Sequence, residues 1–278
     1  MQTTETRDLI RLFDTHCHLD LPELAIDAQL WAQQAVAAGV RHILVPAVSP
    51  KRWDVQHELQ RFLAQQVPQL HIHLALGVHP WWHRDVTPQA WPQLEQRLQG
   101  AQYAAVGECG LDFSLDWLAE SERETERQRQ TEVFRAQVEI AQALHKPLVL
   151  HHRKSQPELL AVLKQSRFCH GGILHAFSGS QAQAKAFLDL GFKLGIGGTI
   201  SYARAEKTRH TVSKLPLDAF VLETDAPSMP LFGYQGQLNH PAMTQRVFAC
   251  FCELRSEEPQ LIAQQLWRNS CLALKLPY

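Results

Sequence analysis

The chain has 278 residues, of which 45% are hydrophobic and 20% are charged, and its formal net charge is −1. This composition excludes an intrinsically disordered chain and is ordinary for a globular protein with a full core. The near-neutral charge argues against a protein that tracks along duplex nucleic acid, because such proteins usually carry a basic face. The length suits two modest domains or one α/β barrel of about 250 residues.

The first residues, 1–8, show no basic start followed by an apolar run, so no export signal is predicted. No apolar run approaches the ~20 residues that a membrane-spanning helix needs. Six cysteines are scattered without CxxC spacing. We therefore expect a cytoplasmic protein with no membrane association and with reduced, mostly buried thiols.

Short apolar runs with strand character alternate with helical patterns along the chain. The predicted strands are 10–14, 41–45, 72–76, 104–107, 148–150, 172–174, 193–196 and 220–222. Helical periodicity marks 25–38, 53–65, 122–145, 158–164 and 182–190. Gly39 and Gly191 stand where a helix C-terminal stop is expected, and 241–274 predicts two closing helices.

Strands that alternate with helices predict parallel pairing through helical crossovers. Eight such repeats favour an α/β fold of the TIM-type (β/α)8 barrel class, formed as a single domain over residues 1–278. An open, doubly wound sheet is the alternative.

Two histidines follow the first predicted strand. His16 and His18 are two residues apart, so in extended chain they face the same way and can bind one ion. Fifteen histidines give about one such pair by chance, so the motif alone is weak. His71 and His73 form a second pair, which we interpret as structural because it begins a strand.

Further polar residues stand at the ends of later predicted strands, where barrel enzymes keep their active sites. They are His79, Glu108, His151, His175 and Asp225. Each alone could be a hydrogen-bonded loop residue, a helix cap or a turn residue. As a set around one barrel mouth they favour a metal site.

Four of these histidines and the two carboxylates are already too many ligands for one tetrahedral zinc ion. They suit two divalent ions about 3.5–4 Å apart, with a carboxylate between them. Mixed nitrogen and oxygen ligands favour zinc or manganese, and magnesium is less natural with so much imidazole.

The motifs in this order resemble the TatD family of metal-dependent deoxyribonucleases, within the amidohydrolase-like TIM barrels. The motifs that carry the resemblance are DTHCHLD at 14–20, GVHP at 77–80, GECGLD at 107–112, LHHR at 150–153, LHAFSGS at 174–180 and LETDAP at 222–227. The resemblance extends from Phe13 to about Leu274.

The family resemblance implies two divalent ions and assigns their ligands. His16 and His18 would hold one ion, His151 and His175 would hold the other, and Glu108 would bridge both.

The resemblance also implies roles beside the ions. Asp225 would complete the first ion site and act as the general base that orients the attacking water. Arg153 would clamp a phosphate, and His79 would lie near the phosphate or the leaving group.

Three positions depart from the family pattern. Ala176 stands where cysteine is frequent, Ser228-Met229 replaces an aromatic-aliphatic pair, and Leu238 stands where an arginine often precedes the asparagine. None is an expected ligand, but the second and third fall on the expected substrate rim.

The hypothesis is metal-assisted hydrolysis of phosphodiester bonds by a monomeric DNA exonuclease, acting on single strands or 3′ ends, or of another phosphoester. No serine or cysteine triad is evident. The alternative is an ester or amide hydrolase, such as a D-aminoacyl-tRNA deacylase. A glutamate at the bridging position, in place of the carbamylated lysine of many amide hydrolases, favours phosphoesters. A non-catalytic binding protein is the third alternative.

Overall fold

The computed structural model describes residues 10–277, and these contain one sheet of eight strands paired in chain order, β1 to β8. Every neighbouring pair is parallel. The strands are β1 (Leu12–Asp14), β2 (Val40–Pro46), β3 (His71–Leu76), β4 (Tyr103–Asp112), β5 (Leu148–Arg153), β6 (Gly172–Leu174), β7 (Phe192–Ile196) and β8 (Phe220–Leu222). The segment in which no export signal is predicted lies outside the described residues.

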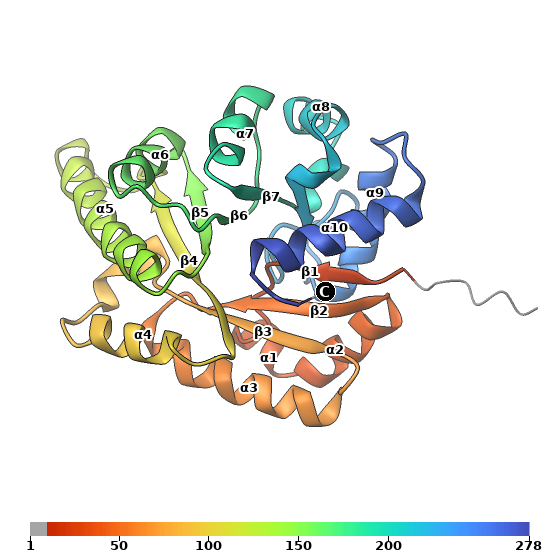
Figure 1. The fold of residues 1–278 in the computed structure, drawn as a ribbon, viewed down its shortest axis with the longest axis horizontal. Helices are drawn as coiled ribbons and strands as arrows, with labels where there is room; N and C mark the ends of the chain where they lie inside the picture. The colour runs from red at the N-terminus through yellow and green to blue at the C-terminus, as the bar shows by residue number, and fades with distance from the viewer. Residues whose placement is uncertain (1–9, 278) are drawn as a thin grey trace, which may run out of the picture.

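The helices form an outer ring around the strands, as Figure 1 shows. They are α1 (Pro22–Ala25), α2 (Ala28–Ala37), α3 (Trp53–Gln66), α4 (Ala90–Leu98), α5 (Glu120–Ala143), α6 (Gln156–Gln165), α7 (Gln181–Leu188), α8 (Glu206–Lys214), α9 (Thr244–Cys252) and α10 (Pro259–Ala273). The (β/α)8 expectation is confirmed, and α9 and α10 are the two predicted closing helices.

Two strands run further than their apolar patterns predicted. β4 continues to Asp112 and β5 to Arg153, because their ladder resumes beyond a register shift and pairs Gly110 with His151. Glu108 and His151 therefore lie within strands, whereas the sequence placed them just after strand ends.

The barrel closes where its first and last strands meet. The backbone N–H and the hydroxyl of Thr15 both donate to the carbonyl of Leu222, at 2.9 and 2.8 Å. The N–H of Asp225 donates to the carbonyl of His16 at 2.9 Å. The seam is thus formed by residues at the carboxyl ends of β1 and β8, beside the expected site.

Within residues 10–277, two apolar clusters form the core, and the smaller one fills the inside of the barrel. Its buried members come from most of the strands and from the end of α10: Phe13, Leu44, Ala75, Ala105, Val149, Ile173, Val221, Ala273 and Leu274. Trp267 of α10 packs against it and contacts the ring of His42, with the ring centroids 4.6 Å apart. α10 therefore closes the amino end of the barrel.

The predicted pair His71 and His73 lies at that amino end. Nε2 of His73 is 3.1 Å from Nδ1 of His42, and the ring of His71 lies against His42. None of these rings belongs to a potential ion-holding group within residues 10–277. The histidine pair is therefore part of the packing, as predicted.

All six cysteines are free, but only Cys17, Cys109 and Cys271 are buried. Cys169 is exposed, so the expectation of mostly buried thiols holds for half of them. No helix in the described range combines the length and apolarity that crossing a bilayer requires.

Candidate metal centre

Glu108 on β4 is the centre of the polar cluster at the carboxyl end of the barrel, and it is only 2% exposed. Its Oε2 lies 3.2 Å from Nε2 of His16 and 3.3 Å from Nε2 of His18. Those two nitrogens are 3.2 Å apart, and Oδ1 of Asp225 lies 3.6–3.7 Å from both. Ligands bonded at about 2.0–2.2 Å to one tetrahedral ion are about 3.3–3.6 Å apart, so this set fits a metal.

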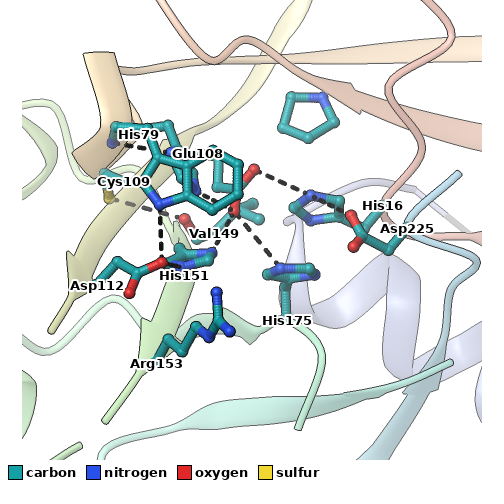
Figure 2. Close-up of polar contacts among 12 residues, drawn as sticks. His16, His79, Glu108, Cys109, Asp112, Val149, His151, Arg153, His175 and Asp225 are labelled. Atoms are coloured by element: carbon teal, nitrogen blue, oxygen red, sulfur yellow. Dashed lines mark hydrogen bonds and ion pairs between the residues drawn. The ribbon is translucent and has the colours of Figure 1, made fainter. Parts of the chain in front are cut away.

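The other carboxylate oxygen of Glu108 faces a different set of rings. Its Oε1 lies 3.0 Å from Nδ1 of His151 and 3.5 Å from Nε2 of both His175 and His79. Figure 2 shows the rings of His151 and His175 below the carboxylate and His16 to one side. The two oxygens of one buried carboxylate thus divide the histidines between two positions.

Two histidines are oriented by groups on their outer side. Nδ1 of His18 lies 3.2 Å from the carbonyl oxygen of Pro46, which can only accept, so this nitrogen carries the proton. Nδ1 of His175 lies 3.3 Å from Oε1 of Glu223. In both rings Nε2 is left to present its lone pair to the centre, as metal-binding histidines do.

His151 has its outer partner on Asp112. Nε2 of His151 lies 3.4 Å from Oδ2 of Asp112, and Nδ1 points towards Glu108. Burial favours the neutral form of Asp112, but hydrogen bonds from His151 and the N–H of Ser114 outweigh it and lower its pKa to about 2. An ionised Asp112 can hold the His151 ring with its inner nitrogen towards Glu108.

His79 differs from the other histidines of the cluster. Its Nδ1 accepts the backbone N–H of Trp81 at 3.1 Å, so the proton of the neutral ring is on Nε2, the nitrogen nearest Glu108. Burial, together with the charge of His151, lowers the pKa of His79 well below its usual value. The ring therefore offers a hydrogen bond to the centre, whereas His18 and His175 offer lone pairs.

The electrostatics of the cluster favour positive charge. Burial opposes charge on His18 and His175, but the surrounding carboxylates outweigh burial and raise their pKa values to about 9 and about 10. Burial would likewise raise the pKa of Glu108, but the charges of the facing histidines lower it well below its usual value. The residues present therefore fit divalent cations.

The backbone around the cluster is shaped for these contacts. Gly107 has φ +151°, and a Cβ there would lie 2.7 Å from the carbonyl oxygen of Val149. Asp225 has φ +55°, which aspartate tolerates better than most residues. A Cβ on Gly195 would collide with the carboxylate of Glu223, so the absent side chain makes room for the partner of His175.

Arg153 ends β5 beside the cluster. Figure 2 shows its guanidinium directed towards His151 and His175. Within the described residues it forms no hydrogen bond or ion pair through its side chain. A pocket of about 680 Å³ adjoins it, between α6 and α7. The side chain is therefore free to meet a ligand at the centre.

The structure brings together every residue that the sequence assigned to the metal site. The groups of three that could share an ion are His16–His18–Glu108, His16–His175–Asp225 and His79–Glu108–His151. They overlap, and none contains His151 and His175 together, the pair implied for the second ion. Both rings nevertheless face the same Glu108 oxygen.

Sequence reasoning missed the two outer carboxylates, Asp112 and Glu223. A signal was available for Asp112, which is four residues after Glu108 in β4, because strand residues four apart point to the same side. Strand alternation gave no such signal for Glu223, because Glu223 and Asp225 both follow the end of β8 at Leu222.

The three departures from the family pattern lie around the rim. The N–H of Ala176 donates to Glu223 at 2.6 Å, a contact that its own side chain does not affect. Met229 and Leu238 are 37% and 41% exposed. Directly after Leu238, the side chain of Asn239 donates to the carbonyls of Thr224 and Ser228 and so secures the loop after β8.

Comparison with known proteins agrees with this geometry. The family described as TatD related DNase matches residues 13–275. The metal-dependent hydrolase YjjV of Escherichia coli K12 is 40% identical, covering 97% of this chain and 100% of the relative. The crystal structure of the E. coli YjjV protein superposes with a TM-score of 0.86 at 39% identity, covering 97% of this chain and 100% of that one.

A more distant relative has a more specific name. The 3′-5′ ssDNA/RNA exonuclease TatD of Erwinia billingiae is 26% identical, covering 96% of this chain and 100% of the relative. With the family match over nearly the whole chain, these similarities show that the chain belongs to the TatD family of metal-dependent hydrolases.

Proposed function

We propose that the chain is a two-metal phosphodiesterase that removes nucleotides from single-stranded DNA or from 3′ ends. The observation that carries the proposal is the position of Glu108, whose two buried oxygens face separate sets of histidines. A carboxylate in this position can bridge two ions. Hydrolases with two such ions use them to stabilise both the attacking oxygen and the leaving oxygen during displacement at phosphorus.

The proposed ligands follow from the orientation of the rings. His16, His18 and Asp225 would hold the first ion with Oε2 of Glu108. His151 and His175 would hold the second ion with Oε1. Zinc or manganese suits this mixture of imidazole and carboxylate better than magnesium does.

Divalent ions at such a centre supply Lewis acidity and lower the pKa of water to about 7. The remaining roles fall to side chains of this chain. Asp225, whose carboxylate is 14% exposed, would accept the proton of the attacking water. Arg153 would bind a non-bridging phosphate oxygen, because a guanidinium makes charge-assisted hydrogen bonds with phosphate.

We assign His79 to the substrate side of the centre. Its protonated Nε2 would donate a hydrogen bond to the phosphate or to the leaving oxygen. A ring with its proton on the inner nitrogen cannot also bind a metal through that nitrogen without losing the proton.

One relative is named as an exonuclease of single-stranded DNA and RNA, which supports nucleic acid as the substrate. The pocket of about 680 Å³ beside Arg153 provides room for a ligand of some kind, since it falls in the range of about 300–1,000 Å³ that is usual for small-molecule sites.

A time course on a fluorescently labelled single-stranded oligonucleotide tests the proposal. Chelator-treated protein is resupplied with manganese, zinc or magnesium beside the Glu108→Ala variant. A ladder of shortened products that the variant does not make supports a metal-dependent exonuclease. Intact substrate with every metal, from protein that has rebound its ions, would overturn the nuclease proposal and direct the search to aminoacyl esters and amides.

A further inference from the structure

Two tryptophans beside the metal centre have most of their side-chain surface exposed. Trp81, in the 3-10 helix Pro80–Asp85 after β3, is 61% exposed, and Trp117, in the loop after β4, is 69% exposed. Both line one pocket of about 320 Å³. Two exposed indoles that line the same pocket form an exposed apolar patch, which is the kind of feature that marks a ligand-binding groove.

Trp81 is held against the centre. Its indole N–H donates to Asp112 at 2.8 Å, and the same carboxylate orients His151. The ring centroid of Trp81 lies 5.1 Å from that of His79 and 6.4 Å from that of His151. The exposed part of this indole is therefore continuous with the centre and fixed relative to it.

The charges in this pocket do not favour phosphate. Two carboxylates, Asp112 and Glu126, line it together with one guanidinium, that of Arg84, which is already paired with Glu126 at 2.9 Å. Arg153 stands opposite Asp112 in the β4–β5 register but does not line the pocket. A phosphate would thus be drawn to Arg153, while an uncharged planar group is better suited to the indoles.

We infer that the pocket between Trp81 and Trp117 binds an unpaired nucleobase of a single-stranded nucleic acid whose phosphate lies at the metal centre. The inference rests on the proposed function and deepens it. Stacking on an aromatic ring tolerates any base, because every base has a π face, but it requires that the base has left its duplex. The pocket thereby selects single strands and frayed ends over paired DNA.

The test is a double-mutant-type cycle in which the indole is removed from the protein, the bases are removed from the oligonucleotide, or both are removed. Binding of a fluorescent oligothymidylate with hydrolysis-resistant phosphorothioate linkages is followed by anisotropy, with the full chain carrying its metals. A second oligonucleotide of equal length and charge carries abasic residues in place of the bases. Trp117→Ala is compared with Phe62→Ala, which removes an aromatic ring that is 45% exposed on α3.

Trp117→Ala should weaken binding of the base-bearing strand about fivefold to tenfold, the lower end of the effect of losing one stacked base. It should leave the abasic strand unaffected, and Phe62→Ala should affect neither. Trp81→Leu should behave like Trp117→Ala, whereas Trp81→Phe should retain most of the affinity because it keeps a stacking face.

Equal weakening of both strands would overturn the inference, because the indole would then not act through a base. Unchanged binding in both tryptophan variants would also overturn it, and would direct attention to a protein partner for the exposed indoles. Metal-dependent cleavage by the parent chain, together with unchanged binding in both tryptophan variants, would mean that the nuclease proposal stands while the base pocket fails. A base-dependent loss of binding in Trp117→Ala, with no cleavage by the parent chain in the presence of any metal, would mean that the base pocket stands while the nuclease proposal fails.

Discussion

The two ends of the barrel each hold a cluster of histidines, and the clusters differ in what surrounds them. At the carboxyl end, His151 and His175 each have a carboxylate on their outer side and Glu108 on their inner side. At the amino end, the rings of His42 and His73 face each other. Both rings pack against Phe13, and His42 also packs against Trp267.

The surroundings decide the charge of each cluster. Carboxylates raise the pKa of His175 to about 10, whereas burial and neighbouring histidines lower the pKa of His42 to about 4 and that of His73 to about 3. The carboxylates around its histidines therefore distinguish an ion site from a packed histidine cluster. Histidine spacing alone does not distinguish the two ends.

The largest effect is expected from Glu108→Gln, which keeps the shape of the shared side chain but removes its charge. Metal content should fall sharply, and hydrolysis should fall by more than about 100-fold, since even outer partners of metal ligands contribute about 10–100-fold. Metal analysis and initial rates measure both. His73→Gln at the amino end is the control. If Glu108→Gln keeps its metal, the carboxylate is not what distinguishes the ion site from the amino-end cluster.

The next effect is expected from Glu223→Gln, which leaves all proposed ligands in place. The amide cannot stabilise the protonated outer nitrogen of His175 as the carboxylate does, so metal affinity or activity should fall about 10–100-fold. Metal titration of chelator-stripped protein gives the affinity. An affinity equal to that of the parent chain would show that the outer carboxylate does not support the site.

A smaller effect is expected from Arg153→Ala, on the substrate alone. Loss of one charge-assisted hydrogen bond should raise KM about tenfold or more while metal content stays constant. Arg11, close enough to the amino-end cluster to lower the pKa of His42, provides the matched control Arg11→Ala, which should change neither. Simultaneous loss of metal from Arg153→Ala would indicate a structural role instead.

The last effect concerns stability at the amino end, not activity, and its dependence on pH. Since the folded pKa values of His42 and His73 lie below the unfolded value of about 6.5, the unfolded chain binds more protons between about pH 6.5 and about pH 4. Stability should fall as pH falls through this window, by at most about 1.4 kcal/mol per pH unit for each ring.

Denaturant unfolding of chelator-stripped protein at several pH values measures this slope. A variant in which both rings are replaced, H42Q with H73Q, should show a shallower dependence than the parent chain. An identical slope in the two proteins would mean that these rings are protonated in the folded state.

The sequence was sufficient for the barrel and for the candidate ligands, because both depend on local patterns. Apolar runs alternate with helical periodicity, and polar residues stand near the strand ends. The extension of β4 through Glu108 to Asp112 could not be predicted, because two glycines interrupt its pattern and it is held by pairing with β5 and by hydrogen bonds to Ala47 and Gln130, which are distant in sequence.

The orientation of the rings was equally beyond the sequence. Whether a histidine presents a lone pair or a proton depends on what its outer nitrogen contacts. For His18 that contact is a carbonyl on β2, and for His79 it is a backbone N–H two residues later. The distinction between ligand and donor therefore appears only with the tertiary structure.

The seam between β1 and β8 has a consequence for the synthesis of the protein. Thr15 and Leu222 are separated by 207 residues, and His16 meets Asp225 across the same seam. The ribosome releases His16 and His18 long before the segment that completes their surroundings. Contacts of such long range form late, since the chain must first lose the entropy of a large loop. A nascent or prematurely terminated chain that lacks β8 thus has no paired Asp225 and no closed barrel, so hydrolytic competence arises only when nearly the whole chain has been made.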